Sequence, residues 1–105
     1  MLVVVGRPHD ALVWDAGNLA HLRPGISREE VDAMYDSGRY ECFGEWYVDD
    51  RGIEHWQERL VGRTPAGRYL TAACELLDDG RYRPITVWAS SRSEVIAYRR
   101  LNPDD

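Results

Sequence analysis

The sequence predicts a single α+β domain in which helices pack against an antiparallel sheet. Capping signals and apolar residues at helical spacing mark two regions, residues 15–38 and 91–101. Between these regions lie four alternating segments separated by short clusters of turn residues, which is the pattern of a four-stranded meander. Because 105 residues bury only one core, we expect residues 1–105 to fold as one domain.

Two helices are predicted before the sheet. The first begins at the N-cap Asp15 and is about two turns long, because Pro24 and the glycine after it stop the helix. The second follows a capping box in which Ser27 is the N-cap and Glu30 is the third helical residue. This helix ends near Gly38, where the helical spacing of apolar residues stops.

Four strands are predicted next, over residues 40–48, 53–63, 68–77 and 81–89. Pro84 lacks a backbone N–H, so it places the start of the last strand at a sheet edge or at a bulge. A final helix is predicted from Arg92 to Leu101, because Ser91 and Glu94 form a second capping box. We expect the helices to pack on one face of the twisted sheet.

The charge balance excludes a protein that coats nucleic acid. The chain has 13 basic residues, all of them arginine, and 18 acidic residues, which gives a net charge of −5 and a pI near 5.1. Such a balance rules out a broad cationic surface. Arginine is nonetheless well matched to phosphate, because its planar guanidinium donates two parallel hydrogen bonds.

Other features exclude a membrane protein and a metalloprotein. No apolar run approaches the ~20 residues that a bilayer span needs, and the apolar start of the chain lacks the charged region of a secretion signal. Cys42 and Cys74 lie far apart without metal-ligand spacing, so we expect two buried thiols, no metal and a cytoplasmic location. No phosphate-binding loop or dinucleotide motif is present, so no cofactor is expected.

Arginines near the ends of the predicted strands are candidates for holding phosphate. They are Arg59, Arg63, Arg68, Arg81, Arg83 and, in the last helix, Arg92. Antiparallel pairing is expected to bring several of them together, and such a cluster would stabilise the charge of a phosphodiester under attack. The alternative is that these arginines only solvate the ends of the strands.

The histidines are the default candidates for proton transfer, because their side chains titrate near neutral pH. They are His9, His21 and His55. His55 is preferred because it lies in a polar strand, whereas His21 lies on a short helix beside Leu22. The alternative for each histidine is a structural role.

The aromatic residues divide between core and surface. Trp14 and Trp46 are expected to be buried, and Tyr98 is expected to join the core from the last helix. Trp56 and Trp88 lie opposite the aliphatic positions of their strands, so one of them is expected to be exposed for a partner or a base.

Several short motifs follow one another in an order typical of a known family. They are Trp14-Asp15, Asn18, His21, Gly25-Ile26, Glu29-Glu30-Val31, Arg59-Leu60-Val61-Gly62-Arg63-Thr64, Gly67-Arg68-Tyr69-Leu70, Arg83-Pro84-Ile85-Thr86 and the pair Glu94 and Tyr98. In order and spacing they resemble the BrnT-type toxins of bacterial type II toxin–antitoxin pairs. The resemblance covers nearly the whole chain and implies the RelE-like fold, in which helices pack on a twisted antiparallel sheet.

The resemblance implies a metal-independent endoribonuclease that a cognate antitoxin neutralises. RNA would be cleaved by attack of its 2′-hydroxyl on the adjacent phosphate, which needs a base and cations. The candidate catalytic residues are His55, His21, Arg68 and Arg83, and the candidate RNA-phosphate contacts are Arg59, Arg63 and Arg92. Operator DNA would be bound only through the antitoxin complex. The sequence leaves the oligomeric state open between a homodimer and a heterotetramer with the antitoxin.

Two positions depart from the family pattern. Trp88 stands where the family usually has an arginine, and Pro24 replaces a histidine or lysine before the glycine turn. These departures and the net charge of −5 favour a second hypothesis, a catalytically weak or inactive relative that works by binding a protein partner. A basic antitoxin would be the partner best matched to this acidic chain.

Overall fold

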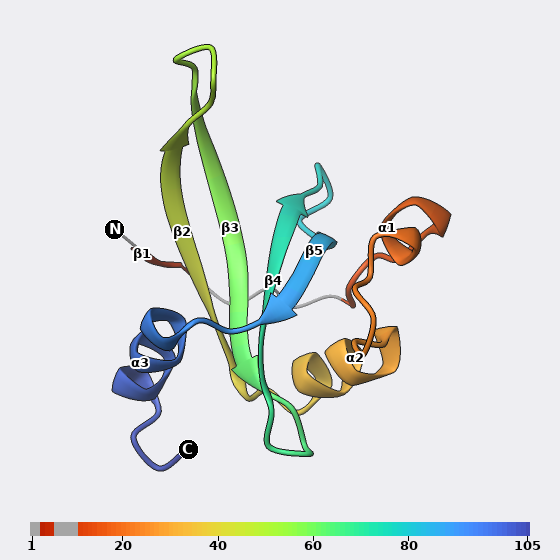
Figure 1. Ribbon diagram of the computed structural model, residues 1–105, viewed down its shortest axis with the longest axis vertical. Helices are drawn as coiled ribbons and strands as arrows, with labels where there is room; N and C mark the ends of the chain where they lie inside the picture. Colours follow the sequence, from red (N-terminus) through yellow and green to blue (C-terminus); the bar gives the residue numbers. More distant parts are fainter. Residues whose placement is uncertain (1–2, 6–10) are drawn as a thin grey trace.

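The computed structural model describes residues 3–5 and 11–105, and it has the predicted α+β class (Figure 1). The strands are β1 (Val3–Val5), β2 (Tyr40–Val48), β3 (Glu54–Arg63), β4 (Tyr69–Leu76) and β5 (Tyr82–Ala89). The helices are α1 (Ala16–Ala20), α2 (Arg28–Asp36) and α3 (Arg92–Leu101). None of the helices in this described part of the chain has the length and apolarity that crossing a bilayer requires.

The sheet is the predicted antiparallel meander, in which each strand pairs with the next along the chain. A short strand that we did not expect, β1, pairs with β2 at the far edge, because three successive valines are too few to show alternation. At the other edge, Cys74 pairs with Pro84 while Ala73 pairs with Thr86, so one extra residue of β5 forms an irregularity. The edge position and the bulge expected from Pro84 are both confirmed.

The predicted helix caps are largely confirmed. Asp15 accepts a hydrogen bond from the Asn18 backbone N–H at 3.0 Å, and the Asn18 side chain accepts one from the Asp15 backbone N–H at 2.7 Å. The helix that follows is shorter than the two turns we expected, because His21 is already its C-cap. The segment after it packs against the core through Leu22 and Ile26 instead of continuing the helix.

The two later caps differ in how their glutamates are used. Ser91 and Glu94 form the complete capping box that the sequence predicts. Ser27 accepts a hydrogen bond from the Glu30 backbone N–H, as expected, but the Glu30 carboxylate binds Arg68 instead of closing the box. Only half of the second capping box is therefore formed.

Helices cover both faces of the sheet, so the prediction that they share one face is wrong. One cluster packs α2 on one face, and its members include Val31, Met34, Cys42, Leu60 and Ala72. The other cluster packs α3 on the opposite face, and its buried members are Phe43, Val61 and Tyr98. Adjacent residues of a strand point to opposite faces, so Cys42 and Phe43 each need apolar cover. Tyr98 is buried, as predicted.

The β2–β3 hairpin projects beyond the rest of the sheet (Figure 1). Its pairing reaches Val48 and Glu54, whereas β3 pairs with β4 only as far as Glu58. Trp46 lies on this projecting part and is 63% exposed, so the prediction that it is buried is wrong. Trp46 does alternate with core residues of β2, but none of α1, α2 and α3 covers the sheet at this end.

Candidate functional site

Arg59, a predicted phosphate contact, lies on the sheet face that α3 covers. Its Nη1 donates a hydrogen bond to Glu94 Oε2 at 3.0 Å, and its Nη2 donates one to Glu45 Oε2 at 2.5 Å. The side chain is only 18% exposed. Two carboxylates therefore bind this guanidinium within the protein and neutralise its charge.

Glu94 accepts hydrogen bonds from several directions. Besides Arg59, the Ser91 backbone N–H donates to its Oε1 at 2.8 Å and the Trp88 indole N–H donates at 3.0 Å. Burial raises the pKa of this carboxyl, but the hydrogen bonds that it accepts outweigh burial, so the pKa of Glu94 lies below its ordinary value. Trp88 supplies a neutral donor to Glu94 and no positive charge.

Arg68 and Arg83, two predicted catalytic residues, each make a two-point ion pair. Arg68 donates from Nε to one oxygen of Glu30 at 3.1 Å and from Nη2 to the other. Arg83 donates from Nε and Nη2 to the two oxygens of Asp15, at 2.7 and 3.0 Å. The hydrogen bonds from Arg83 hold the pKa of Asp15 well below its usual range, and Asp15 in turn raises the pKa of Arg83.

The three arginines share one structural role. Each binds an acidic residue in the first turn or at the N-cap of a different helix: Asp15 of α1, Glu30 of α2 or Glu94 of α3. A carboxylate at a helix N-terminus is already favoured by the helix dipole, and each ion pair joins its helix to the sheet. The structure therefore separates Arg59, Arg68 and Arg83 instead of gathering them into one phosphate site.

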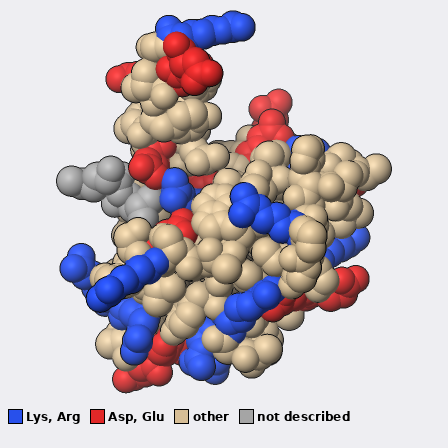
Figure 2. All heavy atoms as spheres, in the orientation of Figure 1, with Lys and Arg blue, Asp and Glu red and all other residues tan. Residues whose placement is uncertain are grey.

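Arg63 and Arg92 are the predicted phosphate contacts that have no carboxylate within ion-pair distance among the described residues. The Arg63 guanidinium lies 5.9 Å from the centre of the Tyr69 ring. Arg92 is exposed in the first turn of α3. Figure 2 shows arginine side chains spread over the lower part of the visible face with acidic side chains beside them, and no single basic patch.

His55 holds the turn of the β2–β3 hairpin. Its Nε2 lies 2.7 Å from Asp49 Oδ2, and its ring stacks on Tyr47 with centroids 5.1 Å apart. Asp49 Oδ1 accepts hydrogen bonds from the backbone N–H groups of Arg51 and Ile53, both at 2.9 Å. The hydrogen bond to His55 is the largest cause of the lowered pKa of Asp49. These contacts favour the structural alternative for this histidine.

His21, the second histidine candidate for catalysis, lies apart from this turn. His21 is exposed as the C-cap of α1, far along the chain from the hairpin and in a different element. His9 lies outside the described residues. The structure therefore brings none of the predicted arginines into an ion pair or hydrogen bond with a histidine in the part of the chain it describes.

The described cysteines and acidic residues are of the types that can form a metal centre. Within residues 3–5 and 11–105, no three His, Cys, Asp or Glu side chains come together as a metal site. Cys42 and Cys74 form no disulfide and are buried, as predicted, and burial raises the pKa of the Cys74 thiol. These thiols are part of the core, not of a reactive site.

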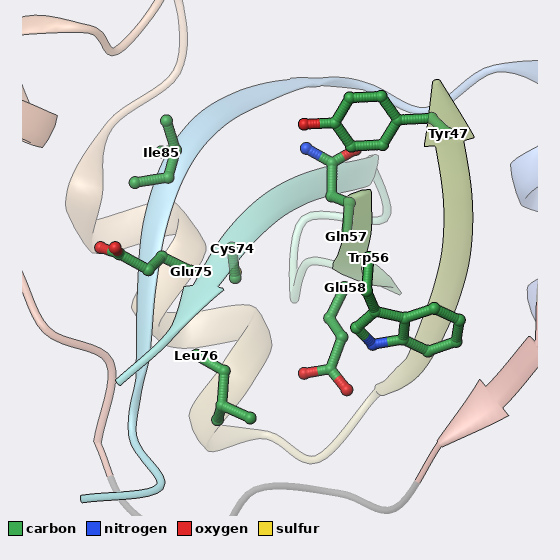
Figure 3. Close-up of a pocket in the computed structure, with 8 residues that line it drawn as sticks. All are labelled: Tyr47, Trp56, Gln57, Glu58, Cys74, Glu75, Leu76 and Ile85. Carbon is green, nitrogen blue, oxygen red and sulfur yellow. The ribbon is translucent and has the colours of Figure 1, made fainter. Parts of the chain in front are cut away.

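A cleft of about 350 Å³, here called the hairpin cleft, separates the β2–β3 hairpin from the β4–β5 hairpin (Figure 3). On the first side it is lined by Tyr47, Trp56, Gln57 and Glu58, and on the second by Cys74, Glu75, Leu76 and Ile85. Trp56 and Gln57 are successive residues on opposite faces of β3, yet both line the cleft. The cleft is therefore the gap that β4 leaves when it diverges from β3.

Exposed apolar side chains concentrate on the projecting hairpin. Trp46 and Trp56 face each other across β2 and β3 with ring centroids 5.2 Å apart, and Trp56 is 40% exposed. Val48 and Ile53 continue this exposed surface toward the turn. A contiguous exposed apolar surface of this kind is typical of an interaction site.

Sequence reasoning missed the hairpin cleft. The density of aromatic residues around the turn at 49–52 was a usable signal, and the prediction that Trp56 or Trp88 is exposed was correct for Trp56. Trp88 is half-buried and bound to Glu94. What the residues could not show is that β4 stops pairing with β3 at Glu58, because that depends on how the two hairpins diverge.

Comparison of the chain with protein-family models, curated proteins and solved structures found no match.

Proposed function

We propose that this chain is a protein-binding module whose binding surface is the hairpin cleft and the exposed apolar side chains of the β2–β3 hairpin. The observation that carries the proposal is that Arg59, Arg68 and Arg83 each bind a carboxylate at the start of a helix. The carboxylate offsets the positive charge of each guanidinium and so weakens its attraction for a phosphate. Exposed tryptophans, by contrast, are typical anchors of protein–protein interfaces.

On the strength of the sequence motifs, the domain is a RelE-like one that resembles a toxin. Its partner is the cognate antitoxin. Two helices, a meander and a last helix support this assignment. The chain works in the cytoplasm, where its two buried thiols stay reduced. The acidic residues of the hairpins favour a basic partner.

The proposal is tested by complex formation with a small basic protein encoded by the neighbouring gene. The two proteins are co-expressed, and their affinity is measured by titration calorimetry. The double variant Trp46→Ser/Trp56→Ser should bind at least tenfold more weakly, because it removes the exposed aromatic anchors. The matched control is Ile96→Ser/Leu101→Ser, which removes exposed apolar side chains from α3 and should bind like the wild type. Equal affinity of the two variants would refute the proposed surface.

A ribonuclease is the second candidate, favoured by Arg63 and Arg92, whose guanidinium groups have no carboxylate partner among the described residues. Attack of the 2′-hydroxyl would leave a cyclic phosphate on the RNA product, which is detected by mass spectrometry. Arg63→Ala/Arg92→Ala should then abolish cleavage, and Arg68→Ala/His55→Ala is the comparison variant for the site expected from sequence. Intact RNA with the wild-type protein, and no growth arrest on expression, would reject this candidate.

A further inference from the structure

The hairpin cleft contains an open edge of the sheet. The pairing of β3 with β2 extends to Glu54, but its pairing with β4 ends where Glu58 meets Cys74. Residues 54–57 therefore have a strand on one side and, among the described strands, none on the other. In an antiparallel pair, alternate residues direct their backbone N–H and C=O groups to the same neighbour. Half of these residues thus present unpaired backbone groups toward the cleft.

The side chains around this edge are apolar and acidic. Trp56 and Leu76 face the cleft from its two sides, and Leu76 is 55% exposed. Of the eight residues that line the cleft, two are acidic, Glu58 and Glu75, and none is basic; Glu75 also lies 3.8 Å from Arg83 Nη1, outside the lining. Glu54, at the end of the open edge, is exposed and adds a third carboxylate. The surroundings therefore favour apolar and cationic side chains over anionic ones.

We propose that the hairpin cleft binds an extended, basic segment of a partner protein, which adds to β3 as a strand along residues 54–57. Backbone hydrogen bonds to the open edge would supply the common part of the affinity. Alternate side chains of the segment would point to opposite sides, so apolar ones would contact Trp56 and Leu76 on one face while cationic ones would meet Glu75 on the other. The inference rests on the proposed function and names the chemistry of the partner.

Defined peptides test this inference on the full chain. The probe is a capped eight-residue peptide of alternating arginine and valine, and its acidic counterpart has glutamate in place of arginine. The basic peptide should bind at least tenfold more tightly than the acidic one, measured by tryptophan fluorescence. Amide hydrogen exchange of residues 54–57 should slow when it binds. Equal affinities, or unchanged exchange at these residues, would overturn the inference.

Backbone pairing is tested with two N-methylated forms of the basic peptide, one methylated at every arginine and one at every valine. Only one set of alternate amides can face β3, so one form should lose binding and the other should keep it. If both forms bind as well as the unmodified peptide, no strand is added.

Side-chain recognition is tested with single variants of exposed residues. Leu76→Ser and Glu75→Gln should each weaken binding about fivefold or more. Their matched controls, Leu101→Ser and Glu29→Gln, change exposed residues of the helices and should leave binding unchanged. Equal losses in variants and controls would place the peptide elsewhere on the chain.

Peptide binding tests strand addition, whereas binding of the partner protein tests the proposed function. If no peptide binds while Trp46→Ser/Trp56→Ser still loses the partner, strand addition is wrong and the proposed function stands. If the double variant keeps the partner, the proposed function itself fails, whatever the peptide does.

Discussion

Glu94 shows at the scale of one residue how this chain uses its charges. It is 3% exposed and accepts hydrogen bonds from an arginine, an indole and a backbone amide. A buried carboxylate is stable only when its hydrogen bonds replace those of water, and here they do. The result is a pKa below the ordinary value in spite of burial.

Glu94→Gln is expected to lower the free energy of unfolding by about 2 kcal/mol at pH 7, because charge-assisted hydrogen bonds become neutral ones. The folded-state pKa lies below the unfolded one, so this stabilisation is complete above the unfolded value of about 4.3 and is lost as pH falls through the folded value. Urea unfolding of both proteins at pH 7, 5 and 3 measures the difference.

The control for this experiment is Glu29→Gln, which changes an exposed glutamate in the first turn of α2. Its effect should stay within about 0.5 kcal/mol of zero at pH 7. A difference between wild type and Glu94→Gln that stays constant down to pH 3 would show that the carboxylate is not what the network stabilises.

Gly62 is a second residue whose identity is set by its contacts. A Cβ atom at this position would lie 2.3 Å from the backbone oxygen of Arg39 and 2.9 Å from the Tyr40 Cα. Backbone atoms cannot move aside cheaply, so Gly62→Ala should lower the free energy of unfolding by about 2 kcal/mol or more, measured by urea unfolding. Gly80→Ala is the comparison: it has open space but a φ of +88°, and should cost about 1 kcal/mol.

At the scale of elements, the recurring contact is an arginine in a strand or next to one that binds the acidic start of a helix. This ion pair matters most for α1, whose five residues are too few to form a stable helix alone. Arg83 binds its N-cap Asp15 with two hydrogen bonds, and Asn18 anchors it through hydrogen bonds to the backbone oxygens of Val13 and Pro84. The ion pair and the amide together hold this short helix at the edge of β5.

Arg83→Gln is therefore expected to loosen α1 locally. Amide hydrogen exchange over residues 16–20 should become severalfold faster, because a glutamine cannot make the two-point ion pair with Asp15. Exchange over β3 and α3, which lie away from this ion pair, should be unchanged. Arg81→Gln is the matched control, since the Arg81 side chain binds Asp79, a residue of its own turn. Equal acceleration in both variants would show that Arg83 does not hold the helix.

At the scale of the whole molecule, the acidic balance favours association with a basic partner. The net charge of −5 acts over a distance of about 10 Å at 0.1 M salt, and higher salt shortens this distance. The complex with a basic partner should therefore weaken about tenfold or more between 0.05 and 0.5 M salt, mainly through slower association, which stopped-flow fluorescence measures.

Two variants separate the apolar contribution to binding from the electrostatic one. Trp46→Ser should weaken binding at every salt concentration without changing the salt dependence, because it removes an apolar contact. Glu75→Gln should reduce the salt dependence, because it removes one charge of the cleft. An affinity that does not change with salt would contradict the electrostatic part of the binding model.

Local signals in the sequence determined most of the secondary structure. Asp15, Ser27 and Ser91 are N-caps where the sequence predicts them, and the four long strands begin and end within a residue or so of the predicted bounds. These features depend on neighbours in the chain, such as a side chain three residues from the amide that it caps. The short β1 escaped prediction because its pairing with β2 is not local.

The sequence by itself thus determined an α+β chain with an antiparallel meander and its capped helices. Only the tertiary structure decided which charges meet: the same arginines that fit a phosphate are bound by Asp15, Glu30 and Glu94. It also decided that helices cover both faces and that Trp46 lies outside the core. The physical reason is that pairing of charges and burial depend on contacts between residues far apart in the chain, which no local pattern encodes.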